Sequence, residues 1–192
     1  MSLSRIEAPT TEPLTLAELK LHCRVDFADD DALVTSLGTA ARECVESMTG
    51  RALISQTWIL TLDRFPREIR IPVCPVQAKA DSVTITYIDP SGTVQTLSPT
   101  LFDVDAISEP ARIQPAYGQQ WPETRDTQNA ITVTFISGYG DSGDDVPESL
   151  KCAIRLLTAH WYEHRELAGA TITPLPMAVD LLCWQFRCKE IA

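Results

Sequence analysis

Residues 131–141 read ITVTFISGYGD, and residues 146–166 read VPESLKCAIRLLTAHWYEHRE. The first stretch alternates apolar and polar residues with a period of two, which predicts a half-buried strand. The second starts near a proline suited to the first helical position and carries apolar residues at helical spacing. A glycine-rich turn separates the two periods. This strand–turn–helix order decides how the rest of the chain is divided.

Three further helices are predicted from apolar stripes and capping residues. Thr15 and Glu18 form a capping box at the start of the first helix. The second runs from about Asp30 to Thr49, because apolar residues recur at helical spacing and Gly50 suits its end. A short last helix spans Ala178–Arg187. The helical core is expected to contain Leu37, Cys44, Val45, Leu150, Ile154, Leu157 and Trp161.

Between Ser55 and Gly140 the apolar period is two, and turn residues separate short runs. The sequence Asp89-Pro-Ser-Gly92 predicts a hairpin turn. Shorter extended pieces are expected at Ile69–Ile71, Thr93–Leu97, Phe102–Asp105 and Arg112–Gln114. One apolar sheet core is expected from Trp58, Leu60, Val83, Ile85, Ile131, Val133 and Phe135.

These elements predict an α+β fold, in which a four-helix core of two N-terminal and two C-terminal helices is interrupted by an antiparallel β domain. The expected parts are an N-terminal helical pair at 1–54, a β insertion at 55–140, and C-terminal helices at 141–192. Helices this amphipathic must bury their stripes, which is why they are expected to form one core.

The composition excludes several classes of protein. The formal net charge is −10, which argues against a protein that grips nucleic acid through clustered Lys and Arg. No apolar run approaches the roughly 18 residues of a membrane span, and no secretory signal is visible. None of the six cysteines forms a CxxC pair. We therefore expect reduced core thiols, made in a cytoplasm, rather than a disulfide framework.

One motif points to metal chemistry. His160-x-x-Glu163-His164 matches the inverted zinc-peptidase pattern, in which two histidines bind zinc and the glutamate acts as base. On a helical wheel, however, Glu163 faces solvent, away from both histidines. A catalytic zinc also needs a third protein ligand, which the sequence does not supply. We expect two histidines at the rim of the core, with no catalytic residue, metal or cofactor.

Four blocks of sequence resemble a known family. They are EPLTLAELKLHCRVDFADDDALVTSLGTAARECVESMTGRALISQTW, ARIQPAYGQQWPE, the strand–turn–helix stretch quoted first, and LPMAVDLLCWQFR. In this order they resemble the head–tail connector proteins of tailed phages, the adaptors that dock under the portal. The resemblance implies a structural protein rather than an enzyme, with a zinc-dependent hydrolase using His160, Glu163 and His164 as the alternative.

The resemblance also implies partners and a location. About twelve copies would form a closed ring that meets the portal protein and a tail-side completion protein. The subunit would be assembled in the bacterial host cytoplasm and kept in the virion, and DNA would pass through without being gripped. The interface candidates are Trp121, Val179, Leu182 and Phe186. We expect a monomer or weak oligomer that closes into a ring only on docking, with the tail from Gly169 onward reaching its neighbours or the portal.

Overall fold

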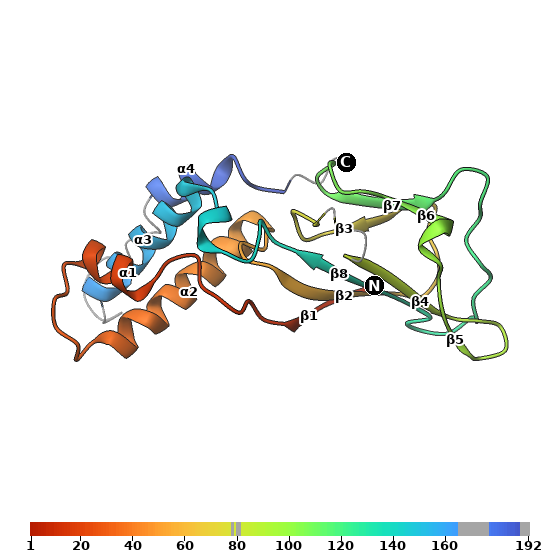
Figure 1. Cartoon of the computed structure of the whole chain (residues 1–192), viewed down its shortest axis with the longest axis horizontal. Helices are drawn as coiled ribbons and strands as arrows, with labels where there is room; N and C mark the ends of the chain where they lie inside the picture. The colour runs from red at the N-terminus through yellow and green to blue at the C-terminus, as the bar shows by residue number, and fades with distance from the viewer. Residues whose placement is uncertain (78, 80–81, 165–176, 189–192) are drawn as a thin grey trace. The chain divides into compact units, whose positions relative to one another are not determined.

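The computed structural model describes residues 1–77, 79, 82–164 and 177–188. The described residues form four α-helices and eight strands in two antiparallel sheets, so the predicted α+β class is confirmed (Figure 1). The chain divides into two compact units. The β unit comprises residues 1–9, 55–139 and 188–192, and the helical unit comprises residues 10–54 and 140–187.

The helical unit contains α1 (Leu16–Cys23), α2 (Asp31–Thr49), α3 (Glu148–Glu163) and α4 (Met177–Trp184). The predicted capping box is present: the Thr15 hydroxyl accepts from the Glu18 amide, and Glu18 Oε2 accepts from the Thr15 amide at 2.8 Å. Gly50 ends α2 in the left-handed conformation, as expected. No helix in the described ranges is both long enough and apolar enough to cross a membrane.

Within the helical unit, α2 packs against α3, α1 contacts both, and α4 lies against α3 and the adjoining part of α2. Four of the predicted core residues are fully or almost fully buried, namely Val45, Leu150, Ile154 and Leu157. Leu37, Cys44 and Trp161 are only half-buried. The expectation that these three lie in the core is therefore only partly met.

The buried face of α2 carries small residues where the sequence pattern favoured large ones. It presents Val34, Gly38, Ala41 and Val45 to its neighbours. A Cβ on Gly38 would lie 2.4 Å from Leu19 Cδ1, so a larger residue would require the Leu19 side chain to shift. Close packing of two helices selects small side chains at the contact, and larger apolar residues move to its edges.

The β unit contains a five-stranded sheet in the order β1-β2-β8-β4-β5. Its strands are β1 (Ser2–Glu7), β2 (Gln56–Leu62), β8 (Ile131–Ser137), β4 (Val83–Ile88) and β5 (Val94–Thr96). The central strand β8 pairs Val133 with both Leu60 and Ile85. Six of the seven predicted sheet-core residues are buried, and Trp58 is half-buried. The period of two therefore identified the buried face correctly.

A second sheet of three strands has the order β3-β7-β6. Its strands are β3 (Ile69–Ile71), β7 (Ala111–Pro115) and β6 (Phe102–Asp105). All three were predicted as extended pieces. The expected hairpin is also present, since β4 pairs with β5 around Asp89 and the Asp89 amide donates to the Thr93 carbonyl at 2.9 Å.

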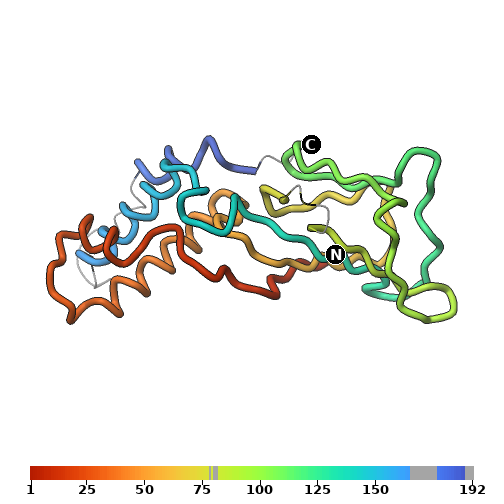
Figure 2. The backbone as a smooth tube through the Cα atoms, viewed as in Figure 1, coloured from red at the N-terminus to blue at the C-terminus, as the bar shows by residue number. Residues whose placement is uncertain are grey.

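The first strand was not predicted. β1 pairs with β2 from Ser2↔Thr61 to Glu7↔Thr57, with an irregularity between Arg5 and Glu7. Figure 2 shows this N-terminal segment running beside residues 56–62. Every β1 residue is exposed, so no buried face marks the strand in the sequence. Residues 1–9 consequently group with the β unit rather than with the N-terminal helical pair.

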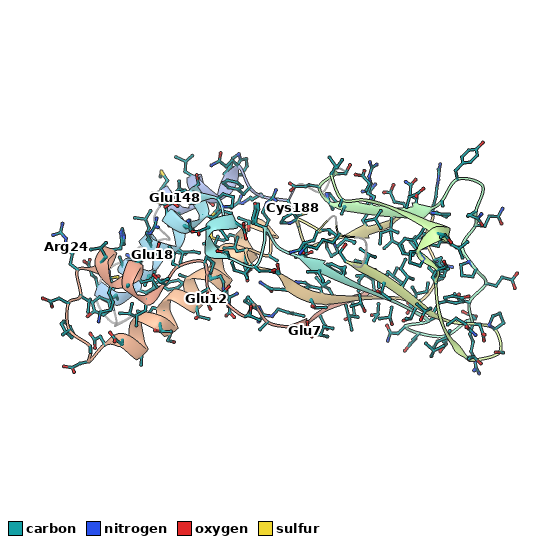
Figure 3. All side chains as sticks on the ribbon, viewed as in Figure 1. Glu7, Glu12, Glu18, Arg24, Glu148 and Cys188 are labelled. Carbon is teal, nitrogen blue, oxygen red and sulfur yellow. A yellow bond between two sulfur atoms is a disulfide. The ribbon has the colours of Figure 1, made fainter. Side chains whose placement is uncertain are left out.

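A disulfide links Cys74 to Cys188, with Cα atoms 6.5 Å apart (Figure 3). The prediction that the cysteines are all reduced is wrong for this pair. The two residues are separated by 114 positions, and only folding brings them together. Cys23, Cys44, Cys152 and Cys183 are free, as expected.

Candidate interaction surfaces

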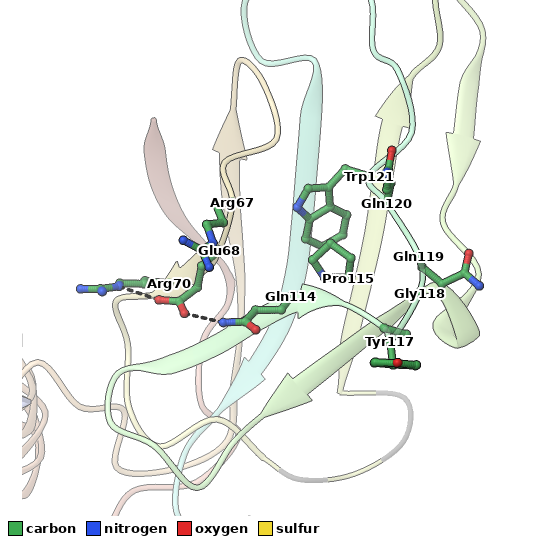
Figure 4. Close-up of a pocket in the computed structure, with 11 residues that line it drawn as sticks. Arg67, Glu68, Arg70, Gln114, Pro115, Tyr117, Gly118, Gln119, Gln120 and Trp121 are labelled. Atoms are coloured by element: carbon green, nitrogen blue, oxygen red, sulfur yellow. Dashed lines mark hydrogen bonds and ion pairs between the residues drawn. The ribbon is translucent and has the colours of Figure 1, made fainter.

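A groove with a volume of about 840 Å³ opens on the β unit beside β3 and β7 (Figure 4). The segment that follows β7 forms one wall, and the loop before β3 forms the other. Its lining combines two arginines with aromatic and amide side chains: Arg67, Glu68, Arg70, Gln114, Pro115, Ala116, Tyr117, Gly118, Gln119, Gln120 and Trp121. Tyr, Trp and Arg are the residues most enriched at the energetic centres of protein interfaces.

Trp121, one of the predicted interface residues, has one ring face occupied within the β unit. It stacks on Phe65, with ring centroids 4.7 Å apart and 6° between the planes. Trp121 is half-buried, and its indole N–H has no hydrogen-bond partner among the described residues. The residue therefore both covers Phe65 and contributes to the groove wall.

Charge in the groove is only partly paired. Glu68 accepts hydrogen bonds from Arg70 Nε at 2.9 Å and from Gln114 Nε2 at 2.6 Å. The hydrogen bond from Arg70, followed by that from Gln114, lowers the pKa of Glu68 below its ordinary value. Arg67 is exposed and has no ion-pair partner among the described residues, and Tyr117 is fully exposed. The groove therefore keeps a cation and a phenol accessible to another molecule.

The remaining interface candidates lie on or just after α4. Val179 is fully buried within the helical unit, together with Cys183. Burial raises the pKa of the Cys183 thiol to about 11, which suits a core residue. Leu182 and Phe186 are half-buried, and the Phe186 carbonyl accepts a hydrogen bond from Arg51 Nε. The structure thus places Val179 in the core of the helical unit rather than on its surface.

The other face of α4 carries the exposed apolar residues, which the sequence reasoning missed. Met177, Leu181 and Trp184 are 87 %, 73 % and 60 % exposed. Their spacing of four and three residues puts them on one side of the helix, and we call them the α4 stripe. This spacing was readable in MAVDLLCW. The sequence favours the other apolar stripe of the same helix, which contains Val179, Leu182, Cys183 and Phe186.

The two histidines of the zinc motif lie next to each other. Their ring centroids are 4.6 Å apart, and His164 Nδ1 lies 2.9 Å from the His160 carbonyl oxygen. Glu163 is exposed. Within the part of the chain that the structure describes, no three His, Cys, Asp or Glu side chains are grouped as metal ligands.

The sequence model of the Phage gp6-like head-tail connector protein family matches residues 13–95, a range that includes α1, α2, β2, β3 and β4. Over these residues the chain is similar to the phage head–tail connector proteins. The resemblance predicted from its sequence blocks is confirmed. The comparison with curated proteins found no similar sequence.

Solved structures extend the connector relationship over the whole chain. A chain in the virion of a native gene transfer agent particle is similar, with a TM-score of 0.81 and 25 % identity over 100 % of this chain and 98 % of that one. The neck of the empty particle, computed with C6 symmetry, gives the same values. The neck of the native particle, computed with C12 symmetry, gives a TM-score of 0.78 with equal identity and coverage. These similar chains are thus components of gene transfer agent particles.

Proposed function

We propose that this protein is a structural subunit of a phage or prophage head–tail connector ring and not an enzyme. The observation that carries the proposal is the full-length similarity to neck subunits of gene transfer agent particles. The four helices would form one core, with the β unit as an insertion between its second and third helices. No observation favours the zinc hydrolase, because Glu163 is exposed and a third ligand is missing among the described residues.

The proposed assembly is a closed ring of about twelve copies, a number supported by the C12 symmetry of the similar neck. On the head side the ring would meet the portal protein, and on the tail side a completion protein. The subunit would be assembled in the bacterial host cytoplasm and remain in the virion. DNA would pass through the ring without being gripped, because the subunit is acidic.

Three of the interface candidates would contact a partner directly, and Val179 would not. Trp121 and its groove would contact another protein of the particle, because the groove holds exposed Tyr117 and Arg67, a cation without an ion-pair partner among the described residues. Leu182 and Phe186 would contribute through their exposed edges. Val179 would act indirectly, by holding α4 against the helical unit. Deleting Leu175–Ala192 would remove that core contact, so a deletion cannot separate docking from folding.

Light scattering of the purified protein, alone and with a portal protein, tests the proposed function. We expect a monomer or weak oligomer alone, because acidic subunits repel one another, and a ring of fixed stoichiometry on the portal. Trp121→Ala should keep the monomer folded. A protein that never associates with portal rings would contradict the proposal, as would stoichiometric zinc that is lost on His160→Ala.

A further inference from the structure

The α4 stripe is an apolar surface that the described residues of the chain leave largely exposed. Val179 and Cys183 are fully buried on the inner side of α4, so the helix is fixed with Met177, Leu181 and Trp184 facing outward. Arg187 lies over the Trp184 ring, with Cζ 5.1 Å from the ring centroid. A contiguous apolar patch of this kind on a soluble subunit marks an interaction surface.

An apolar hollow lies elsewhere in the helical unit. It has a volume of about 140 Å³ and is lined by Glu12, Pro13, Leu14, Leu16, Leu19, Thr35, Gly38, Thr39 and Ile154. Leu14 and Leu19 are 4 % exposed and Ile154 is 1 % exposed, so its floor belongs to the core. An engineered apolar cavity of about 150 Å³ admits benzene. The hollow therefore has room for one large apolar side chain.

The stripe and the hollow lie on different sides of the helical unit. α4 packs on α3, while the hollow is lined mainly by α1, α2 and the residues before α1, with Ile154 of α3 at its floor. In Figure 1, α4 lies at the top of the helical unit and α2 at its bottom. A cyclic ring needs a heterologous contact, in which one surface of each copy meets a different surface of the next. Two apolar surfaces on opposite sides satisfy that requirement.

We propose that the α4 stripe of one copy packs on the next copy, with Trp184 inserted into the hollow beside α1 and α2 and Leu181 at the rim of that hollow, forming the lateral joint of the ring. This inference rests on the proposed function, because it supposes a ring. The occupant is a second copy of this chain, since the similar neck has twelvefold symmetry. A portal segment would not need a matching hollow on the same subunit.

The charged residues beside the stripe and at the rim of the hollow are ion-paired. Arg187 Nη2 pairs with Asp180 Oδ1 at 2.7 Å, so the charges beside Trp184 cancel. At the rim of the hollow, Glu12 Oε2 is paired with Arg42 Nε at 2.8 Å. Arg42 also pairs with Glu43 and Glu46, so these carboxylates face a buried cation although the whole subunit carries a net charge of −10. Repulsion from the rest of the subunit keeps the joint weak until a portal gathers the copies.

Photo-crosslinking from α4 tests the joint. Leu181 is replaced by p-benzoylphenylalanine. The substituted protein is assembled into rings on portal protein and then irradiated. We expect a covalent dimer of the connector subunit whose crosslinked peptide falls within residues 12–39. The matched control places the same group at Leu21, which is 81 % exposed and belongs to neither surface. That position should give no crosslink into the hollow of another copy.

Crosslinks from position 181 to the portal, or to another part of the neighbouring copy, would overturn this joint while leaving the ring subunit intact. Failure of the unmodified protein to assemble would instead contradict the proposed function, and the joint with it. As a second measurement, Leu181→Glu with Trp184→Glu, and separately Thr35→Arg, should each weaken ring assembly at least about tenfold. Unchanged assembly of the folded variants would also overturn the joint.

Discussion

Arg42 donates a hydrogen bond from Nε to Glu12 Oε2 at 2.8 Å, although only 3 % of Arg42 is exposed. Its Nη1 also donates to Glu46 Oε2 at 2.7 Å. Burial by itself lowers the pKa of Arg42, but the carboxylates of Glu46, Glu12 and Glu43 together raise it. The buried guanidinium thus fastens the segment before α1 to α2, beside Glu12, which is labelled in Figure 3.

Arg42→Met should destabilise the helical unit by about 3 kcal/mol, because it removes the buried guanidinium that pairs with the nearly buried Glu46 and with Glu12. Urea unfolding measures the change. The matched control is Arg155→Met, whose ion pair with Glu148 is largely exposed and should be worth no more than about 1 kcal/mol. Equal effects of the two substitutions would contradict a special role for the buried pair.

Leu157→Ala should lower the free energy of unfolding by about 2–5 kcal/mol, because Leu157 is fully buried and the substitution leaves a cavity. Leu181→Ala provides the matched control on an exposed face and should stay within about 0.5 kcal/mol. Chemical denaturation of both variants checks the prediction. A loss below about 0.5 kcal/mol at position 157 would show that this residue lies at the surface.

The Cys74–Cys188 disulfide should stabilise the β unit, because it closes a loop of more than 100 residues in the unfolded chain, worth about 4–5 kcal/mol by chain entropy. Cys188→Ser should therefore lower the melting temperature under oxidising conditions but not in excess reductant. Cys23→Ser is the control for loss of a free thiol. Thiol titration of the oxidised, unfolded protein should find four free cysteines; six would refute the bond.

Asp89 should titrate far below an ordinary aspartate. Hydrogen bonds from the Ser91 hydroxyl, then the Thr93 amide and the Gln95 amide group, lower its pKa from 3.8 to about 2. Because the folded pKa is depressed, the stabilising effect on the β4–β5 hairpin is complete above the ordinary value. It is lost as pH falls through about 2. Carboxyl chemical shifts followed by NMR check this, and a midpoint near 3.8 would rule out the hydrogen-bonded turn.

The protein should not bind duplex DNA tightly at physiological ionic strength. The net charge is −10, so phosphates are repelled rather than neutralised by clustered cations. Fluorescence anisotropy with a labelled duplex, with and without assembled rings, measures the affinity across a salt series. Submicromolar binding that weakens steeply with salt would show that the ring lumen grips DNA.

The sequence determined those features that depend on neighbouring residues. Thr15 capped α1 and Gly50 ended α2 because capping is satisfied within one turn of helix. β3 and β6 begin and end at the expected residues because alternation and turn chemistry are local. The blocks of sequence resembling head–tail connectors were likewise readable without a structure, and both the family match and the neck structures support them.

Tertiary structure alone decided what depends on distant partners. β1 has no buried face, so only its pairing with β2 defines it. Cys74 and Cys188 meet across 114 residues. On α4 the sequence offers two apolar stripes, and packing against α3 buries Val179 while it leaves Leu181 in solvent. A helix has no intrinsic inner side: the neighbours that cover one stripe decide which residues remain free for another molecule.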